Sequence, residues 1–364
     1  MWKQIVGWLG LSVLTAGLIV GCGLSTSNDS GESHTVGSSN QSPTADCRVI
    51  EHDLGKTEIC GQPQKVAVLS AYALDLLLSL DMQPAGYPPP LNTYQGEVFD
   101  NPAQQIPYLG DRLTTQPINL GSDSEPSLEK LALLKPDLIV GEVGHIDNYK
   151  LLSQIAPTLL WRNRTAKGQW RESLREIAAA LGRDQKAEVV IQQYEARIAD
   201  ARADLADVVA AHPTLLLLGA NRLDEHVFAL SADSYLGELL GGVGFQLIPK
   251  PSADIKPGVP ISVEALLELD DADTIIILSW DFDVSDLTLK NPDTSANKLM
   301  SHLMETHQVQ TIKQHWETNA IAQSLTASQE NRVYFATYYK WNGLNGPIGA
   351  ELILEQLRQF LLKD

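Results

Sequence analysis

The chain has 364 residues, of which 44% are hydrophobic and 6% aromatic, and this composition is ordinary for a water-soluble globular protein. Its formal net charge of -18 argues against nucleic acid as a partner, because such binding depends on clustered Lys and Arg side chains. The net charge does not decide the charge of a small ligand, because a buried pocket can be locally basic.

The N-terminal residues are typical of an export signal. Lys3 precedes an apolar run at residues 5–20, and this run stops at Cys22. The run is shorter than the roughly 20 apolar residues of a membrane-spanning helix, and no stop-transfer charges follow, so residues 1–21 are interpreted as a signal peptide. Residues 19–22 resemble the lipobox of bacterial lipoproteins, in which the cysteine thiol takes a diacylglycerol. The resemblance implies that Cys22 carries a lipid that holds the mature chain on a membrane; the alternative is an ordinary secretory signal that ends near a cysteine.

A polar segment follows at residues 22–46, with hardly an apolar side chain and no periodicity. This composition predicts a disordered tether between the lipid and the folded part. About 320 residues lie beyond it, more than one compact core normally holds, so two lobes are favoured over one.

Cys47 and Cys60 flank a segment that is typical of a β-hairpin. If they pair across the strands, His52 lies opposite Gly55 and residues 53–54 form the tip. In an exported protein such a pair is expected to form a disulfide. Two free, buried thiols are the alternative.

Short β-rich runs alternate with helical patterns through the rest of the chain. This alternation predicts βα units and mostly parallel sheets. The runs are at residues 66–70, 137–141, 158–161, 214–219, 274–279 and 332–336.

A long helix is predicted at residues 184–212, which contain no Gly or Pro and carry one apolar stripe. Such a helix would be on the order of 40 Å long, enough to run the length of two stacked lobes. It could also be a core helix of one large domain. Residues 127–140 and 262–277 each read as a Ser-apolar-Glu helix that leads into an apolar strand, which hints at two lobes built alike.

Sequence motifs of catalysis are absent: there is no G-x-S-x-G, no phosphate loop and no G-x-G-x-x-G after a strand. The chain is therefore not expected to be an enzyme.

A group of metal-capable side chains lies near residue 305: His302, Glu305, His307 and His315. On a helix, His307 points away from the face that His302 and Glu305 share. They are interpreted as a solvated surface helix; a metal-ion binder or a lipid-anchored enzyme that uses this cluster is the alternative from another class.

Several segments in one order resemble the iron-siderophore solute-binding proteins of ABC importers. The resemblance runs from about Cys47 to the C-terminus. It rests on the hairpin and on the following segments: Val66-Ala-Val-Leu-Ser, Asp75-Leu-Leu-Leu-Ser-Leu, Pro84-Ala-Gly-Tyr, Ser127-Leu-Glu-Lys-Leu, Lys135-Pro-Asp-Leu-Ile-Val-Gly, Ile155-Ala-Pro-Thr, Trp170-Arg-Glu-Ser-Leu and Arg332-Val-Tyr-Phe.

The resemblance implies two α/β lobes, residues 47–183 and 213–364, joined by one long backbone helix at 184–212, with the ligand between the lobes. It implies a monomer on the periplasmic or cell-surface side of the membrane that delivers its ligand to a permease dimer driven by an ATPase. In this family a glutamate on each lobe docks onto permease arginines, and Glu129 and Glu264 stand at the matching positions.

The implied ligand is an Fe(III)-siderophore complex whose iron is saturated by the small molecule, so we expect aromatic walls and Arg or Lys donors, with no cofactor and no protein-to-iron bond. Cobalamin or haem is the nearest alternative. The pocket residues that the resemblance implies are Tyr72, Arg112, His145, Arg222, Lys256, Tyr338, Tyr339 and Trp341.

Two of these positions depart from the hydroxamate binders. Those proteins usually carry an arginine where this chain has Asp123, so Arg112 is considered as an upstream substitute. They carry an aromatic residue where this chain has His145, which would make binding depend on pH. The other tryptophans considered, which are interpreted as core or lobe-packing residues, are Trp161, Trp170 and Trp280.

Overall fold

A computed structural model of the protein describes residues 46–362, except for 91–93, 95, 226, 249–257, 259 and 282–305. The predicted signal peptide, Cys22, Lys256, His302 and Glu305 lie outside the described residues. The described residues belong to one compact unit. None of their helices is long and apolar enough to cross a membrane.

The hairpin consists of β1 (Cys47–His52) and β2 (Gly55–Cys60), and its register is the predicted one. Cys47 lies opposite Cys60, and His52 lies opposite Gly55. A disulfide joins the two cysteines, whose Cα atoms are 4.0 Å apart. The hydroxyl of Thr57 donates to the carbonyl of Thr158 at 3.0 Å and lies 2.9 Å from His52 Nε2, so polar side chains anchor the hairpin to the sheet beneath it.

The first sheet is entirely parallel, with short strands in the order β5-β4-β3-β6-β7. Its strands are β3 (Val66–Val68), β4 (Gly86–Tyr87), β5 (Ile118–Asn119), β6 (Leu138–Glu142) and β7 (Thr158–Trp161). Its helices are α1 (Ala71–Ser79), α2 (Pro102–Gln105), α3 (Leu128–Leu134), α4 (Tyr149–Ile155) and α5 (Gln169–Leu181), with 3-10 turns η2 (Gly110–Arg112) and η3 (Val143–Asn148).

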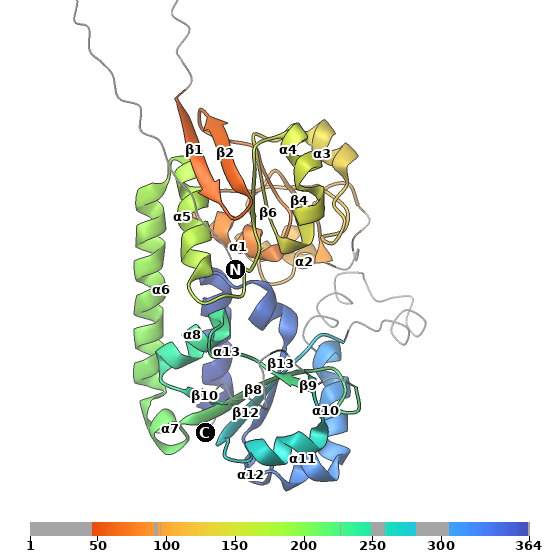
Figure 1. Cartoon of the computed structure of the whole chain (residues 1–364), viewed down its shortest axis with the longest axis vertical. Helices are drawn as coiled ribbons and strands as arrows, with labels where there is room; N and C mark the ends of the chain where they lie inside the picture. The colour runs from red at the N-terminus through yellow and green to blue at the C-terminus, as the bar shows by residue number, and fades with distance from the viewer. Residues whose placement is uncertain are drawn as a thin grey trace, which may run out of the picture. The chain divides into compact units, whose positions relative to one another are not determined.

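Helices cover both faces of this sheet because successive residues of a strand point to opposite sides. Val66 and Val68 pack in the cluster that contains α1 and α5, whereas Ala67 packs with α3 and α4 in another. This sheet, its helices and the hairpin are called the N-terminal lobe below (Figure 1).

The second sheet is mixed, in the order β11-β9-β8-β12-β13, with β10 also paired to β8. The pairs of β8 with β10 and β12, and of β12 with β13, are parallel; β9 is antiparallel to β8 and β11. The strands are β8 (Thr214–Ala220), β9 (Val227–Ala229), β10 (Gln246–Ile248), β11 (Pro260–Ile261), β12 (Thr274–Ser279) and β13 (Val333–Thr337).

Helices pack on this second sheet in the same way, and sheet and helices are called the C-terminal lobe below. Leu216 and Ile277 share a cluster with α10 and α11, whereas Leu217 and Ile276 point to the face covered by α8 and α13. The helices are α8 (Tyr235–Val243), η4 (Val263–Leu269), α10 (Gln308–Thr318), α11 (Ala320–Ser324), α12 (Thr326–Gln329), η6 (Tyr339–Gly343) and α13 (Pro347–Leu361). The six predicted β-rich runs are all strands, and the predicted α/β class with mostly parallel sheets is confirmed.

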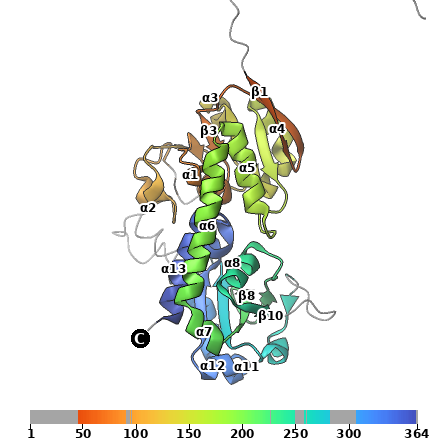
Figure 2. The same ribbon diagram turned by 90° about the vertical axis from the view of Figure 1, so that its left-hand side faces the viewer.

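The long helix connects the lobes, but it is not continuous to residue 212. The helix α6 (Asp184–Asp204) ends at Leu205, whose ψ of 7° leaves the helical range, and α7 (Ala206–Ala211) begins immediately after. Leu205 is fully buried, as the predicted apolar stripe requires, and the prediction of one continuous helix is wrong only in its backbone at this residue. Figure 2 shows α6 running past α5 of the N-terminal lobe and past α8 and α13 of the C-terminal lobe, and α6 contacts all three helices.

A buried carboxylate links the two lobes next to this helix. Asp75, on α1, accepts the backbone N–H of Ile348 at 3.0 Å and of Gly349 at 2.8 Å, in the first turn of α13. The N-terminus of α13 carries partial positive charge and free N–H donors, which suits an acceptor. Gly346 is needed here, because a Cβ on it would lie 2.5 Å from the Asp75 carboxyl carbon.

The free energy of unfolding should depend on the protonation of Asp75. Burial raises the pKa of this carboxyl from 3.8 to about 6. Because this pKa is higher in the folded than in the unfolded protein, protonation of Asp75 stabilises the folded state. This stabilisation is fully present below the unfolded-state pKa and is lost as the pH rises through about 6. In urea unfolding, the stability of the wild type relative to Asp75→Asn should therefore fall by about 2–3 kcal/mol between about pH 4 and pH 7. A difference that does not change with pH would contradict this role of Asp75.

Candidate functional site

A cleft with a volume of about 180 Å³ lies between the lobes, where the carboxyl ends of strands from both sheets meet. Ligands of α/β proteins collect at such strand ends. Ser70 follows β3, Arg164 follows β7, and Trp280 follows β12 directly. The residues that line the cleft are Ser70, Ala71, Asp123, Glu142, Arg164, Trp280, Tyr338, Tyr339 and Gly343.

The C-terminal lobe gives the cleft an aromatic wall. The rings of Trp280 and Tyr338 meet edge to face, with centroids 5.2 Å apart, and Phe228 packs behind Trp280 at 5.6 Å. The ring of Tyr339 stacks on Tyr108 of the N-terminal lobe at 5.8 Å. Since aromatic faces offer large, rigid contact area, this wall suits a bulky organic ligand.

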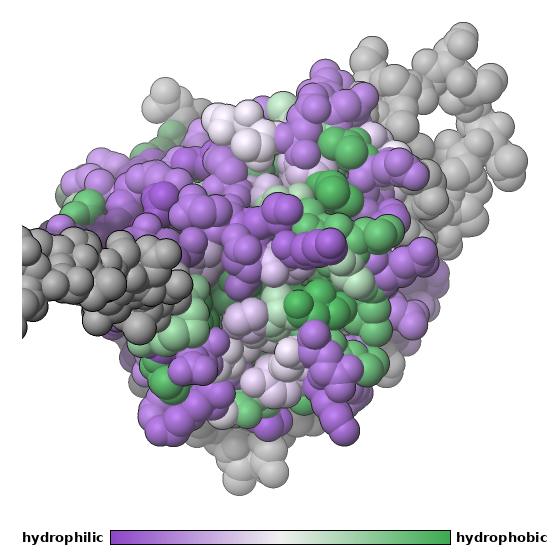
Figure 3. All heavy atoms as spheres, turned by 90° about the horizontal axis from the view of Figure 1, so that it is seen from above, coloured by the Kyte–Doolittle hydropathy of each residue, from purple (hydrophilic) through white to green (hydrophobic). Residues whose placement is uncertain are grey.

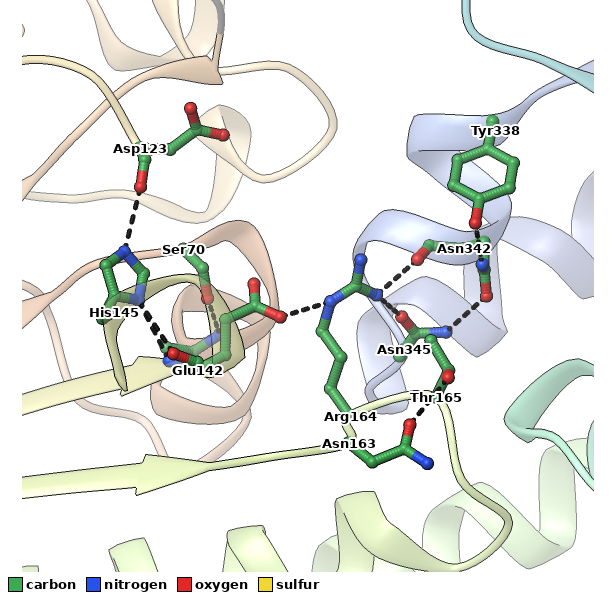
Figure 4. A network of polar contacts seen from close by, with 11 residues as sticks. Ser70, Asp123, Glu142, His145, Asn163, Arg164, Thr165, Tyr338, Asn342 and Asn345 are labelled. Carbon is green, nitrogen blue, oxygen red and sulfur yellow. Dashed lines mark hydrogen bonds and ion pairs between the residues drawn. The ribbon is translucent and has the colours of Figure 1, made fainter. Parts of the chain in front are cut away.

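Arg164 connects the two lobes across the cleft (Figure 4). Its Nε–H pairs with the Glu142 carboxylate, and both groups are mostly buried, with 20% and 14% of their side chains exposed. Its Nη1 donates to the carbonyl of Asn342 and to Oδ1 of Asn345, in the C-terminal lobe. Asn342 in turn donates to the Tyr338 hydroxyl at 2.6 Å, so the arginine and the aromatic wall belong to one network.

His145 is buried behind the cleft and holds two of its acidic residues. Its Nε2 lies 2.9 Å from the carbonyl of Asp123, and its Nδ1 lies 3.2 Å from the backbone N of Glu142. A proton on Nε2 and a lone pair on Nδ1 satisfy both contacts. Burial raises the pKa of the Asp123 carboxyl, and the negative charge of Glu142 raises it further.

The structure places the sequence-predicted residues in different surroundings. Tyr338 and Tyr339 line the cleft. Tyr72 and Trp341 do not, and the expectation that they form pocket walls is wrong, because both side chains are fully buried. Tyr72 packs edge-on against Trp161, and the Trp341 Nε1–H donates to Gln356 at 2.8 Å.

Neither predicted arginine lines the cleft, which corrects both expectations. The Arg112 guanidinium donates to Glu351 of α13 at 2.6 Å, in a separate recess beside α6. Arg222 is exposed and pairs with Asp224 and Glu225 in its own turn. Each guanidinium forms an ion pair with a carboxylate outside the cleft, and neither points into the cleft. His145 acts through its neighbours and does not line the cleft, and Lys256 lies outside the described residues.

Seven cleft residues were not predicted from the sequence, namely Ser70, Ala71, Asp123, Glu142, Arg164, Trp280 and Gly343. For two of them the position was a usable signal, because Glu142 and Trp280 each directly follow a predicted strand. Trp280 in particular is only partly buried and faces the cleft, which corrects its interpretation as a core residue.

The remaining predicted residues lie at the surface or are only partly described. Glu129 and Glu264 are exposed in the first turns of α3 and η4, one on each lobe. Hydrogen bonds from its own backbone N–H and from the Ser262 hydroxyl lower the pKa of Glu264. Of the histidine group, His315 lies 3.6 Å from an Asp224 carboxylate oxygen. The one group of metal-capable side chains found in the described ranges includes Cys47 and Cys60, whose disulfide prevents metal binding.

Comparison with known proteins decides the family. Residues 66–338 match the family model described as periplasmic binding protein. This chain belongs to the periplasmic binding protein family. The match spans both lobes and the helix between them, so it includes the cleft and its aromatic wall up to Tyr338.

Two curated relatives of Bacillus subtilis match nearly the whole chain. YhfQ, named as a candidate ABC transporter substrate-binding lipoprotein, is 27% identical over 96% of this chain and 94% of its own length. The Fe(3+)-citrate-binding protein YfmC is also 27% identical, with the same coverage of each chain. Among solved structures, Staphylococcus aureus SirA in complex with staphyloferrin B shares the fold, with a TM-score of 0.65 at 24% identity over 87% of this chain and 99% of SirA. The resemblance to iron-siderophore binders of ABC importers is confirmed.

Removal of the Arg164 side chain should destabilise the protein. In Arg164→Ala the mostly buried Glu142 carboxylate loses its partner, and the acceptors on Asn342 and Asn345 lose their donor. We expect the free energy of unfolding to fall by about 1–3 kcal/mol in urea titrations. As a control, Arg175→Ala breaks an exposed pair with Glu188 and should cost about 0.5 kcal/mol or less. Equal losses in the two variants would mean that Arg164 does not hold the lobes.

Proposed function

We propose that the chain captures a ferric siderophore complex in the cleft between its lobes and delivers it to the permease of an ABC importer. The observation that carries the proposal is the cleft itself: an aromatic wall from one lobe faces polar groups of the other at the strand ends of two sheets. Family membership and the relative named for Fe(3+)-citrate support iron chelates over cobalamin or haem. The family consists of binding proteins, so the proposal involves no catalysis.

The geometry fits a ligand that brings its own iron ligands. A chelate saturates Fe(III) with its own oxygen atoms, so the protein needs to recognise only the outside of the complex. The ring faces of Trp280 and Tyr338 can pack on an organic chelate, and Arg164 and the tyrosine hydroxyls can form hydrogen bonds to it. Ligand pockets usually have roughly 300–1,000 Å³, so we expect a chelate to enter this smaller cleft with the lobes further apart.

Ferric chelates should quench the tryptophan fluorescence of the protein. Trp280 lines the cleft, whereas Trp161, Trp170 and Trp341 are fully buried elsewhere. We expect saturable quenching by a ferric hydroxamate, a ferric catecholate or ferric citrate, and a smaller amplitude in Trp280→Phe because the nearest reporter is removed.

The iron-free siderophore, cobalamin and haem serve as comparison ligands in the same titration. Quenching by cobalamin or haem, with no response to any ferric chelate, would contradict the proposed ligand class.

Delivery to a permease requires a docking surface on both lobes, and Glu129 and Glu264 are proposed for it. Each is exposed at the start of a helix, and each is followed on the same helical face by an exposed leucine, Leu133 (75% exposed) and Leu267 (53%). Figure 3 looks down on the N-terminal lobe, where hydrophobic side chains interrupt the hydrophilic surface on the side of α3 and α4. Two carboxylates on separate lobes can set the register on a two-fold symmetric partner.

Charge reversal at both glutamates should separate docking from ligand binding. The double variant Glu129→Lys, Glu264→Lys should abolish uptake of the labelled ferric chelate into cells, because two attractive contacts become repulsive. Its dissociation constant for the chelate should stay unchanged, since neither residue lines the cleft. The variant Glu268→Lys changes an exposed charge on the same helix and should keep its uptake. A parallel loss of chelate affinity would argue against a docking role.

The lipid anchor completes the proposal. YhfQ is named as a candidate lipoprotein, which supports placing this chain on a membrane surface through Cys22. A receptor that must find its permease repeatedly gains from confinement to the same membrane, because both then diffuse in two dimensions. The segment 22–46 would be the tether between the lipid and the hairpin.

A further inference from the structure

The described residues that line the cleft carry more negative than positive charge. Asp123 and Glu142 each bring a carboxylate, and Arg164 brings one guanidinium. All three come from the N-terminal lobe, so their charges face the aromatic wall of the other lobe (Figure 4).

The positive charge of Arg164 is already used inside the protein. Its Nε–H pairs with Glu142, and Nη1 donates to Asn342 and Asn345. Only the outer amino group, Nη2, is left for a ligand, and the charge behind it is neutralised by the Glu142 carboxylate. An anionic ligand that approaches Arg164 therefore also approaches Glu142.

The two carboxylates are held in place. His145 bonds to the backbone of both residues, which fixes the loops that carry Asp123 and Glu142 against the cleft. Their charge also reaches Tyr339 of the C-terminal lobe. Burial is the main cause of the raised pKa of Tyr339, and the negative charges of Asp123 and Glu142 raise it further, whereas the positive charge of Arg164 lowers it.

Ferric chelates differ in charge in a way that these carboxylates can detect. Three hydroxamates neutralise Fe(III), and a chelate that also carries a free amine becomes cationic. Three catecholates carry more charge than the metal, and the spare carboxylates of citrate also leave its complexes anionic. A fixed charge near a desolvated ligand rejects a like-charged one, which is how binding sites gain specificity.

We propose that this cleft selects ferric chelates of zero or positive net charge, of the hydroxamate class, and that Glu142 and Asp123 are the residues that reject polyanionic ones. The inference rests on the proposed function and names the ligand class of the same site. Glu142 acts by neutralising Arg164, which keeps the guanidinium from pairing with an anion, and Asp123 adds a further carboxylate.

The test is a set of fluorescence titrations with cationic ferrioxamine B, neutral ferrichrome, and the polyanions ferric citrate and ferric enterobactin. The wild type should bind the two hydroxamates at least about tenfold more tightly than either polyanion. Glu142→Gln and Asp123→Asn should each reduce this preference by about tenfold, because each removes a charge and keeps the shape. Glu268→Gln, which removes an exposed charge outside the cleft, should leave the preference unchanged.

A second readout needs no variant and so does not depend on their folding. Raising NaCl from about 0.1 M to 0.5 M should weaken the binding of ferrioxamine B and strengthen that of the polyanions, because salt screens attraction and repulsion alike. Tighter binding of a polyanion than of both hydroxamates would overturn the charge inference and leave the proposed function standing. Failure of every ferric chelate to bind would overturn the proposed function itself.

Discussion

The contact of Asp75 with the first turn of α13 determines how the two lobes face each other. Asp75 belongs to α1, which begins at Ala71 directly after Ser70, and both residues line the cleft; α13 follows η6, which carries Asn342. A buried carboxylate that accepts two backbone N–H groups is costly to break, because both the charge and the donors would be left without partners. This contact therefore holds the start of α13 against α1.

The other contacts between the lobes lie nearer the cleft and are more easily exchanged. Arg164 reaches Asn342 and Asn345, and the hydroxyls of Tyr87 and Tyr339 lie 3.3 Å apart. Of these groups, Arg164 and Tyr339 line the cleft, so they are placed to form hydrogen bonds to a ligand in place of their present partners. The buried hydrogen bonds of Asp75 would keep the lobes connected. The contacts at the cleft could break when the lobes separate around a ligand and form again when they close.

The fold was predicted well because strands and helices follow from the pattern of neighbouring residues. Which residues line the cleft depends on the direction of single side chains, which that pattern does not give. The hairpin register followed from the spacing of Cys47 and Cys60, and the strand runs followed from their composition. At the start of α1, however, Ala71 and Tyr72 are both apolar and both precede further apolar residues, so the pattern does not say which one turns toward the cleft. The pairing of Arg112 with Glu351 joins segments far apart in the chain, which periodicity does not report.

The central claim is that iron, inside its chelate, lies between the aromatic wall and the Arg164 network. A crystal of the protein soaked with ferrichrome, measured at the iron absorption edge, locates the metal directly. One anomalous peak is expected in the cleft, with the chelate against Trp280 and Tyr338 and with Arg164 and Glu142 on its other side. A peak elsewhere, such as the groove between β2 and α4, with the cleft empty, would contradict it.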